Sequence, residues 1–152
     1  MSGQTTPRGA GIPVFVDVTA QDSGDGVEFS HEWRWGEDGP SEGNGAIAIP
    51  KRLATDPGTE LLFRLNDKST RNLKFSEQQG SAMWVQRNSC PPEDSRCDDP
   101  EIPAGEMTVT PKLLKAFNAN SEQCKLHYRL WFEDNTGASA TYDPEIQNGG
   151  KV

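Results

Sequence analysis

The sequence predicts an all-β protein, a sandwich or barrel of about eight strands. Three observations support this fold class. Several segments alternate apolar and polar residues with period two, which is typical of strands that have one buried and one solvated face. Clusters of Gly, Pro, Asn, Asp and Ser separate these segments and predict turns. No long segment shows the apolar periodicity of a helix.

The first strand is predicted at 13–20. Val14, Val16 and Val18 share one face of this segment, and Asp17 lies on the other. Because successive side chains of a strand point to opposite faces, the valines define the buried face and the aspartate lies on the solvated one.

The clearest alternation follows at 27–35. The even positions of this segment carry charged or hydroxyl side chains, which indicates a solvated face. The odd positions are apolar or aromatic except for one histidine, and they define the buried face of a second strand. These odd positions are Val27, Phe29, His31, Trp33 and Trp35.

The remaining strands are predicted from similar patterns. Segment 59–66 places three apolar residues opposite Glu60 and Arg64, and segment 124–132 has a length that suits the middle of a sheet. Segment 111–118 is expected to be strand or loop, because a turn follows it at once. Shorter strands are predicted at 46–49, 72–75, 83–86, 106–110 and 139–142.

Length and charge limit the possible functions. The chain has 152 residues, a formal net charge of -8 and 33% hydrophobic residues. This length suits a single domain, expected at 12–148 between a flexible arm at 1–11 and a flexible tail at 149–152. No apolar run approaches the ~18 residues of a membrane-spanning helix. Phosphate groups attract basic surfaces, so the acidic balance disfavours nucleic acid and anionic membranes as partners.

The N-terminal segment lacks the apolar stretch of a signal peptide. A cytoplasmic location is therefore expected, or a periplasmic or secreted one if a leader has been removed. The odd number of cysteines argues against an obligatory disulfide framework. Cys90 and Cys97 bracket a short Pro-rich loop and are a possible disulfide pair in an oxidising compartment. Cys124 is expected to be a small buried apolar residue.

A copper-type metal site is one alternative function, with His31, Cys124 and His127 as the candidate ligands. Such a site needs two His, one Cys and a weak axial ligand around one ion. A regular strand places positions 124 and 127 on opposite faces, and both candidate axial methionines, Met83 and Met107, precede the cysteine. The other interpretation is that His31 is a buried histidine bonded to a backbone carbonyl and that His127 is an ordinary strand residue. No cofactor is expected.

The sequence gives little support to catalysis or calcium binding. No G-x-S-x-G, G-x-G-x-x-G or Walker-type loop occurs, so the protein is not expected to be an enzyme. The acidic, Pro-rich stretch 89–105 is expected to be a solvated loop, because its carboxylates lack the spacing of an EF-hand loop.

Four tryptophans are the candidate ligand-binding residues: Trp33, Trp35, Trp84 and Trp131. Tryptophan is enriched at interfaces and supplies a flat apolar platform for ligands or partner proteins. The alternative for Trp84 and Trp131 is packing in the core or between sheets.

Several segments follow one another in a familiar order. They are Ile47–Pro50, Leu61–Leu65, Leu73–Phe75, Trp84–Pro92, His127–Phe132 and Tyr142–Gly150. Over roughly residues 45–150 the chain resembles small bacterial Greek-key β-sandwich proteins of immunoglobulin-like or cupredoxin-like type. The resemblance implies about seven to nine antiparallel strands in a Greek-key sandwich, and it implies no activity. The chain departs from the copper-ligand pattern of cupredoxins.

The sequence therefore favours a non-enzymatic β-sandwich module that binds a ligand or assembles with itself. Sheet edges or sheet faces would supply the contacts in a homo-oligomer or with a protein partner. A copper-type or redox cupredoxin-like protein is one alternative, and a carbohydrate-binding module that uses the tryptophans is the other.

Overall fold

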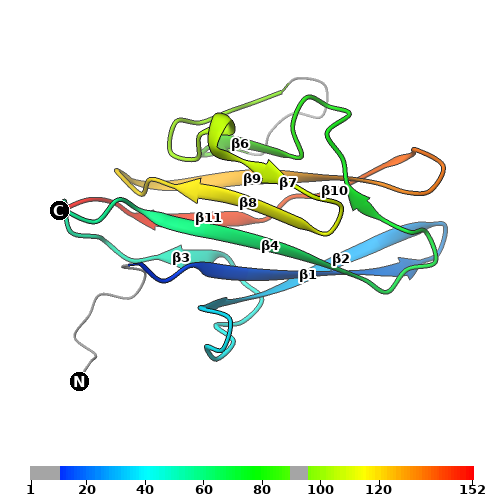
Figure 1. The fold of residues 1–152 in the computed structure, drawn as a ribbon, viewed down its shortest axis with the longest axis horizontal. Coiled ribbons are helices and arrows are strands. Elements are labelled where there is room, and N and C mark those ends of the chain that lie inside the picture. Colours follow the sequence, from blue (N-terminus) through cyan, green and yellow to red (C-terminus); the bar gives the residue numbers. More distant parts are fainter. Residues whose placement is uncertain (1–10, 90–95) are drawn as a thin grey trace.

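Two β-sheets packed face to face form the protein in the computed structural model, which describes residues 11–89 and 96–152 (Figure 1). The first sheet, called the β1 sheet, has the strand order β2-β1-β4-β8-β7. Its strands are β1 (Val14–Ser23), β2 (Gly26–Trp35), β4 (Thr59–Asp67), β7 (Thr108–Val109) and β8 (Leu113–Asn118).

The second sheet, called the β9 sheet, is built around its longest strand. It has the order β10-β9-β11-β3, and β5 and β6 also pair with β9. Its strands are β3 (Ile47–Ile49), β5 (Lys74–Phe75), β6 (Met83–Arg87), β9 (Gln123–Glu133), β10 (Ser139–Tyr142) and β11 (Glu145–Gly149). The short 3₁₀ turn η1 (Ala104–Glu106) precedes β7. In residues 11–89 and 96–152, no helix is long and apolar enough to cross a bilayer.

The all-β prediction is confirmed, and two details of it are wrong. Both sheets are mixed, because β1 pairs in parallel with β4 and β3 pairs in parallel with β11. Parallel neighbours need a long crossover, and between β1 and β4 the chain passes through β2 and then through β3 of the other sheet. The described residues hold eleven strands where seven to nine were expected. Segment 111–118, expected to be strand or loop, contains β8, and the sequence does not predict the short β11.

The alternating pattern of the long strands fills the space between the sheets. The predicted valines of β1 are fully buried, and Trp33 and Trp35 of β2 are 6% and 8% exposed. Aromatic rings from the two sheets pack on each other. The ring centres of Phe63 in β4 and Tyr128 in β9 are 5.4 Å apart, and those of Phe29 in β2 and Phe132 in β9, which stack, are 4.8 Å apart. The buried face predicted from the odd positions of 27–35 is therefore confirmed at these tryptophans.

A buried polar network also ties the sheets together. Asn118 at the end of β8 and Asn148 in β11 exchange two side-chain hydrogen bonds of 2.7 and 2.9 Å. Asn148 Nδ2 also donates to Glu101, which is 2% exposed. The Glu101 carboxylate accepts bonds from the backbone N–H groups of Ser121 and Glu122 and from the Ser121 hydroxyl. These donors outweigh the cost of burial and lower the pKa of Glu101.

The C-terminal residues, expected as a flexible tail at 149–152, are paired with the rest of the chain. Gly149 belongs to β11, Lys151 forms a bridge with Arg52, and Val152 N donates to Arg52 O at 2.9 Å. Gly150 has φ +90°, and a Cβ atom there would lie 2.6 Å from the nitrogen of Gln123, so this approach requires glycine. The expected arm at 1–11 lies outside the described residues except for Gly11.

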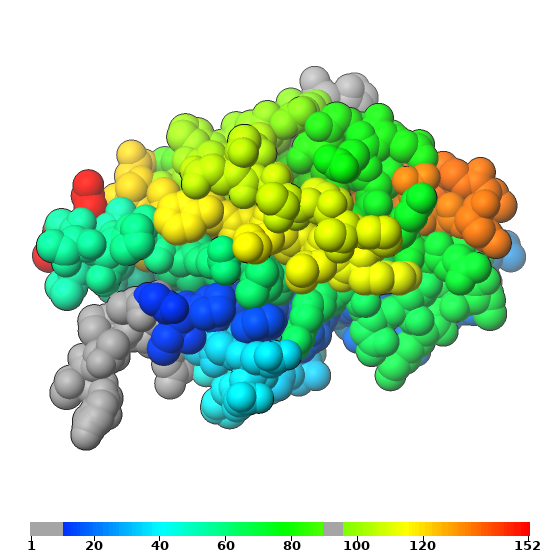
Figure 2. Space-filling view, viewed as in Figure 1, coloured from blue at the N-terminus to red at the C-terminus, as the bar shows by residue number. Residues whose placement is uncertain are grey.

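The loop 36–45 carries the chain from the β1 sheet to the β9 sheet. In the space-filling view it projects, in cyan, below β1 (Figure 2). Part of this loop pairs with β2, because Ser41 forms a bridge with Arg34. The loop therefore covers one end of the β2 edge.

We predict that Trp33→Ala lowers the free energy of unfolding by about 3–5 kcal/mol, the usual result of truncating a large buried aromatic side chain. Urea unfolding of the two proteins measures this difference. Leu53→Ala is the control, because Leu53 is 50% exposed and its truncation should change stability by less than about 0.5 kcal/mol. Equal losses in the two variants would contradict the assignment of the buried face.

A second prediction concerns acid stability. The pKa of Glu101 is lowered in the folded protein, so its carboxylate stabilises the fold above the unfolded-state pKa of about 4.3, and this stabilisation is lost as the pH falls. Glu101→Gln should be less stable than the native protein at neutral pH by about 1–3 kcal/mol. The difference between the two proteins should shrink below pH 4, as measured by denaturant unfolding. A difference that does not change with pH would contradict this role of the carboxylate.

Candidate functional site

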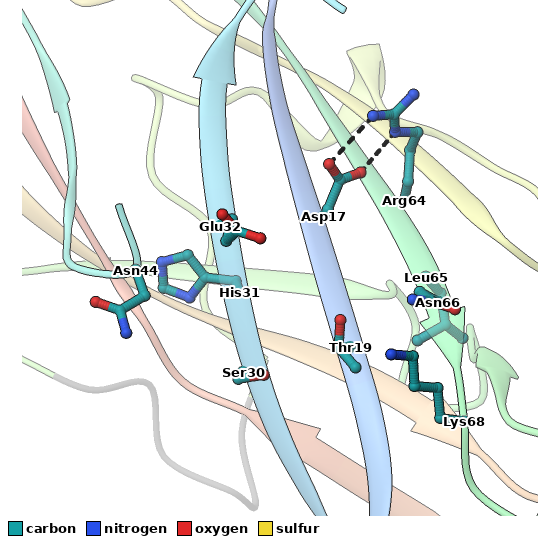
Figure 3. A pocket seen from close by; sticks show the side chains of 10 residues that line it. All are labelled: Asp17, Thr19, Ser30, His31, Glu32, Asn44, Arg64, Leu65, Asn66 and Lys68. Carbon is teal, nitrogen blue, oxygen red and sulfur yellow. Dashed lines mark hydrogen bonds and ion pairs between the residues drawn. The ribbon is translucent and has the colours of Figure 1, made fainter. Parts of the chain in front are cut away.

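A polar groove lies on the outer face of the β1 sheet, over β2, β1 and β4 (Figure 3). Its volume is about 470 Å³, and a larger share of its lining is polar than apolar. The lining residues from the strands are Asp17, Thr19, Ser30, His31, Glu32, Arg64, Leu65 and Asn66, and Asn44 and Lys68 come from adjoining loops. Of these residues, His31 and Leu65 belong to the buried faces of their strands, and the sequence predicted the others only as solvated strand or loop positions.

The register of the three strands arranges the floor of the groove in cross-strand rows. Asp17 of β1 pairs with Glu32 of β2 on one side and with Arg64 of β4 on the other. In the next row Thr19 lies between Ser30 and Asn66. Adjacent strands are about 4.8 Å apart, and successive outward residues of one strand are about 6.8 Å apart, so these side chains form a regular grid.

The charged row is held by ion pairs. Arg64 Nε and Nη2 donate to the two oxygens of Asp17 at 2.7 and 3.2 Å, and Arg64 Nη1 donates to Glu37 at 3.2 Å. The hydrogen bond that Arg64 donates to the Asp17 carboxylate is the main reason why the pKa of Arg64 is raised. The guanidinium also lies 4.6 Å above the ring of Phe15. Arg64 is thus fixed by its neighbours, and it forms a rigid wall of the groove.

The second row offers hydrogen-bonding groups that are not used. In the described part of the chain, the side chains of Thr19, Ser30 and Asn66 make no hydrogen bond with other residues. The same holds for the side chains of Glu32 and Lys68, which stand at the two sides of the groove. Figure 3 shows the Lys68 amine extending toward Thr19. These groups can donate to or accept from a bound molecule.

The charges of the groove cancel. Asp17 and Glu32 are balanced by Arg64 and Lys68, although the whole chain carries a formal net charge of -8. The groove therefore provides local polar contacts without a net field that would favour one sign of ligand charge.

The three candidate metal ligands do not form one site. His31 of β2 donates from Nε2 to the Gly45 carbonyl at 2.8 Å, and its Nδ1 accepts from the Tyr142 hydroxyl at 2.5 Å. Cys124 and His127 lie on opposite faces of β9, and Cys124 packs against the core. The structure does not bring these residues together.

The chemistry of Cys124 is also unfavourable for a metal. Burial raises the pKa of its thiol, and a raised pKa disfavours the thiolate that binds metals. In residues 11–89 and 96–152, no group of three or more His, Cys, Asp or Glu side chains is placed to hold a metal ion. The copper alternative therefore gains no support from the geometry.

The four tryptophans named as candidate ligand-binding residues are all buried, with exposed fractions between 2% and 8%. Trp33 and Trp35 pack edge to face in the core, with ring centres 6.3 Å apart. Trp84 and Trp131 pack on each other at 4.9 Å, outside the main core. A sugar or peptide stacks on an exposed ring face, so these residues do not form a surface platform.

The possible disulfide between Cys90 and Cys97 involves a residue outside the described ranges, because Cys90 belongs to 90–95. Cys97 Sγ lies 3.0 Å from Gln86 Oε1. The disulfide stays a prediction of the sequence.

Comparison with known proteins adds no family to this description. The chain matches no protein-family model and no curated protein sequence.

Proposed function

We propose that the protein is a non-enzymatic binding module whose groove on the β1 sheet holds a neutral, hydroxyl-rich molecule such as a saccharide. The observation that carries this proposal is the grid of unused hydrogen-bonding groups formed by Thr19, Ser30 and Asn66, with Glu32 and Lys68 at its sides. The proposed carbohydrate binding thus depends on residues other than the four tryptophans, which are buried.

The chemistry of the grid suits a polyol better than an ion. Hydroxyl, amide and carboxylate side chains each bond a ligand hydroxyl, which can both donate and accept. A carboxylate or phosphate ligand would be attracted by Lys68 at one side of the groove but repelled by Glu32 at the other side. Because the four charges of the groove cancel, a neutral ligand loses nothing to repulsion.

The rigid position of the grid also supports binding. Thr19 lies on the central strand of the three, held by β2 on one side and β4 on the other. Side chains on paired strands are better fixed than side chains on loops, so less conformational freedom is lost when a ligand binds. The Asp17–Arg64 pair adds a fixed wall to the groove.

His31, the histidine beside the groove, does not support a catalytic role. A general base needs a nitrogen within hydrogen-bond reach of the substrate. Both ring nitrogens of His31 are engaged, one by Gly45 O and the other by Tyr142 Oη. The histidine thus acts as a link between β2 and its neighbours, which supports binding without catalysis.

Three finer proposals accompany this function. We propose that the sandwich has Greek-key connectivity of immunoglobulin-like or cupredoxin-like type, as the order of segments in the sequence implies. A cytoplasmic location is proposed, with a periplasmic or secreted one as the alternative. Association with a protein partner is proposed on the sheet edges considered below.

Isothermal titration with a panel of neutral oligosaccharides tests the binding proposal. At least one of them should bind, and Thr19→Val and Asn66→Ala should each weaken that binding by about twofold to tenfold, which corresponds to one lost hydrogen bond. Glu28→Gln is the matched control, because Glu28 lies on the same face of β2 but outside the groove. Absence of binding by the whole panel, or an equal loss in the control, would reject the proposal.

A further inference from the structure

The edge of β2 already accepts a short piece of added strand. Trp33 N donates to Gly43 O at 3.2 Å, and Glu42 N donates to Trp33 O at 2.7 Å. Ser41 forms an antiparallel bridge with Arg34. Residues 41–43 thus extend the β1 sheet by one strand at the end of β2, and then the chain leaves for the β9 sheet.

From Val27 to His31 this edge pairs with no other strand in the part of the chain that the structure describes, and Val27 and Phe29 are partly exposed while His31 is buried. Because Trp33 bonds to the loop, its N–H and C=O point away from β1, and Gly36 N donates to Pro13 O on the β1 side. In an antiparallel pair these directions alternate along the strand. The main-chain groups of Val27, Phe29 and His31 therefore point outward, and in residues 11–89 and 96–152 they have no hydrogen-bond partner.

Beside the open edge lies a strip of incompletely buried apolar side chains. Val27 and Phe29 of β2 and Ala140 and Tyr142 of β10 are each partly exposed while packed against the core. Phe29 and Tyr142 have ring centres 5.7 Å apart, so the strip runs from one sheet to the other. A strand added to β2 would place every second side chain on this strip.

The opposite face of the same edge is acidic. Glu28 and Glu32 point outward from β2 on either side of Ser30, and all three are exposed. No lysine or arginine lies between Gly26 and Glu32. Lysine on an edge strand is a common protection against unwanted pairing, and this edge lacks it. Basic side chains on an added strand would lie beside the two glutamates.

We propose that the open edge of β2, from Val27 to His31, binds an extended segment of a partner protein in which basic and apolar residues alternate. The segment adds a strand in line with residues 41–43, its main chain bonding to β2, its apolar side chains on the strip and its basic side chains beside Glu28 and Glu32. A second copy of this chain is a poorer occupant. Two β2 edges would bring four glutamates onto one face of the joined sheet, where like charges repel.

The test uses a short synthetic peptide in which Lys and Val alternate, with fluorescence anisotropy as the readout. The native protein should bind it at micromolar concentrations, and binding should weaken as salt is added. A peptide with Glu in place of Lys should not bind. N-methylation of alternate residues removes the N–H groups from one side of the peptide strand. One of the two alternate sets should abolish binding while the other preserves it.

Variants of the protein complete the test. Glu28→Lys should weaken binding of the basic peptide by about tenfold or more, because attraction becomes repulsion. Glu60→Lys, a matched change on β4 away from the edge, should leave binding within about twofold. Thr19→Val should also bind the peptide normally, which separates this inference from the saccharide proposal.

The proposal is overturned if the basic peptide does not bind, or if the acidic peptide binds equally well. It is also overturned if both methylated sets bind, since main-chain pairing would then play no part. A dimer that is detected by sedimentation and that protects the amides of Val27 and Phe29 from hydrogen exchange would assign the edge to a second copy and would reject the partner peptide.

Discussion

The central constraint in this structure is the position of β1 between an antiparallel and a parallel neighbour. Val14, Val16 and Val18 of this strand are fully buried against the β9 sheet, so their register with β2 and β4 is fixed by the core. A slip of one residue would expose the valines and would bury Asp17 and Thr19. Burial of three aliphatic side chains stabilises the fold by several kcal/mol, and the same contacts determine which polar side chains meet on the outer face.

That register links the two proposed functions through β2. The outward side chains of Ser30 and Glu32 on β2 line the groove. The main-chain groups of β2 at the even positions bond to β1, and those at the odd positions point to the edge of the sheet. The ring of His31 forms hydrogen bonds with the Gly45 carbonyl and the Tyr142 hydroxyl. It therefore holds the segment before β3 and the strand β10 beside β2. One strand therefore serves as a wall of the groove and as a template for strand addition.

Much of the fold could be predicted from period-two alternation, because that pattern follows from burial of one strand face. It located β1, β2, β4 and β9 and the buried side of Trp33. Pairing of distant strands leaves no local pattern, so the parallel pairs were missed, and β11 was missed because its five residues lie between Pro144 and Gly150. The groove could not be found from residue types, since Thr19 and Asn66 look like any solvated strand residues until the register places them side by side. The tryptophans do not form an exposed platform, because Trp33 and Trp35 lie on the inner face of β2 and because Trp84 of β6 and Trp131 of β9 pack on each other.

Amide hydrogen exchange in β2, followed residue by residue by NMR, tests the register on which both proposals depend. Glu28, Ser30 and Glu32 should exchange slowly, because their N–H groups bond to β1. Val27, Phe29 and His31 should exchange fast, and Trp33 should again be protected by Gly43. Uniform protection from Val27 to His31 would show that the edge is already covered. Protection of the odd positions alone would contradict the register and, with it, the arrangement of the groove.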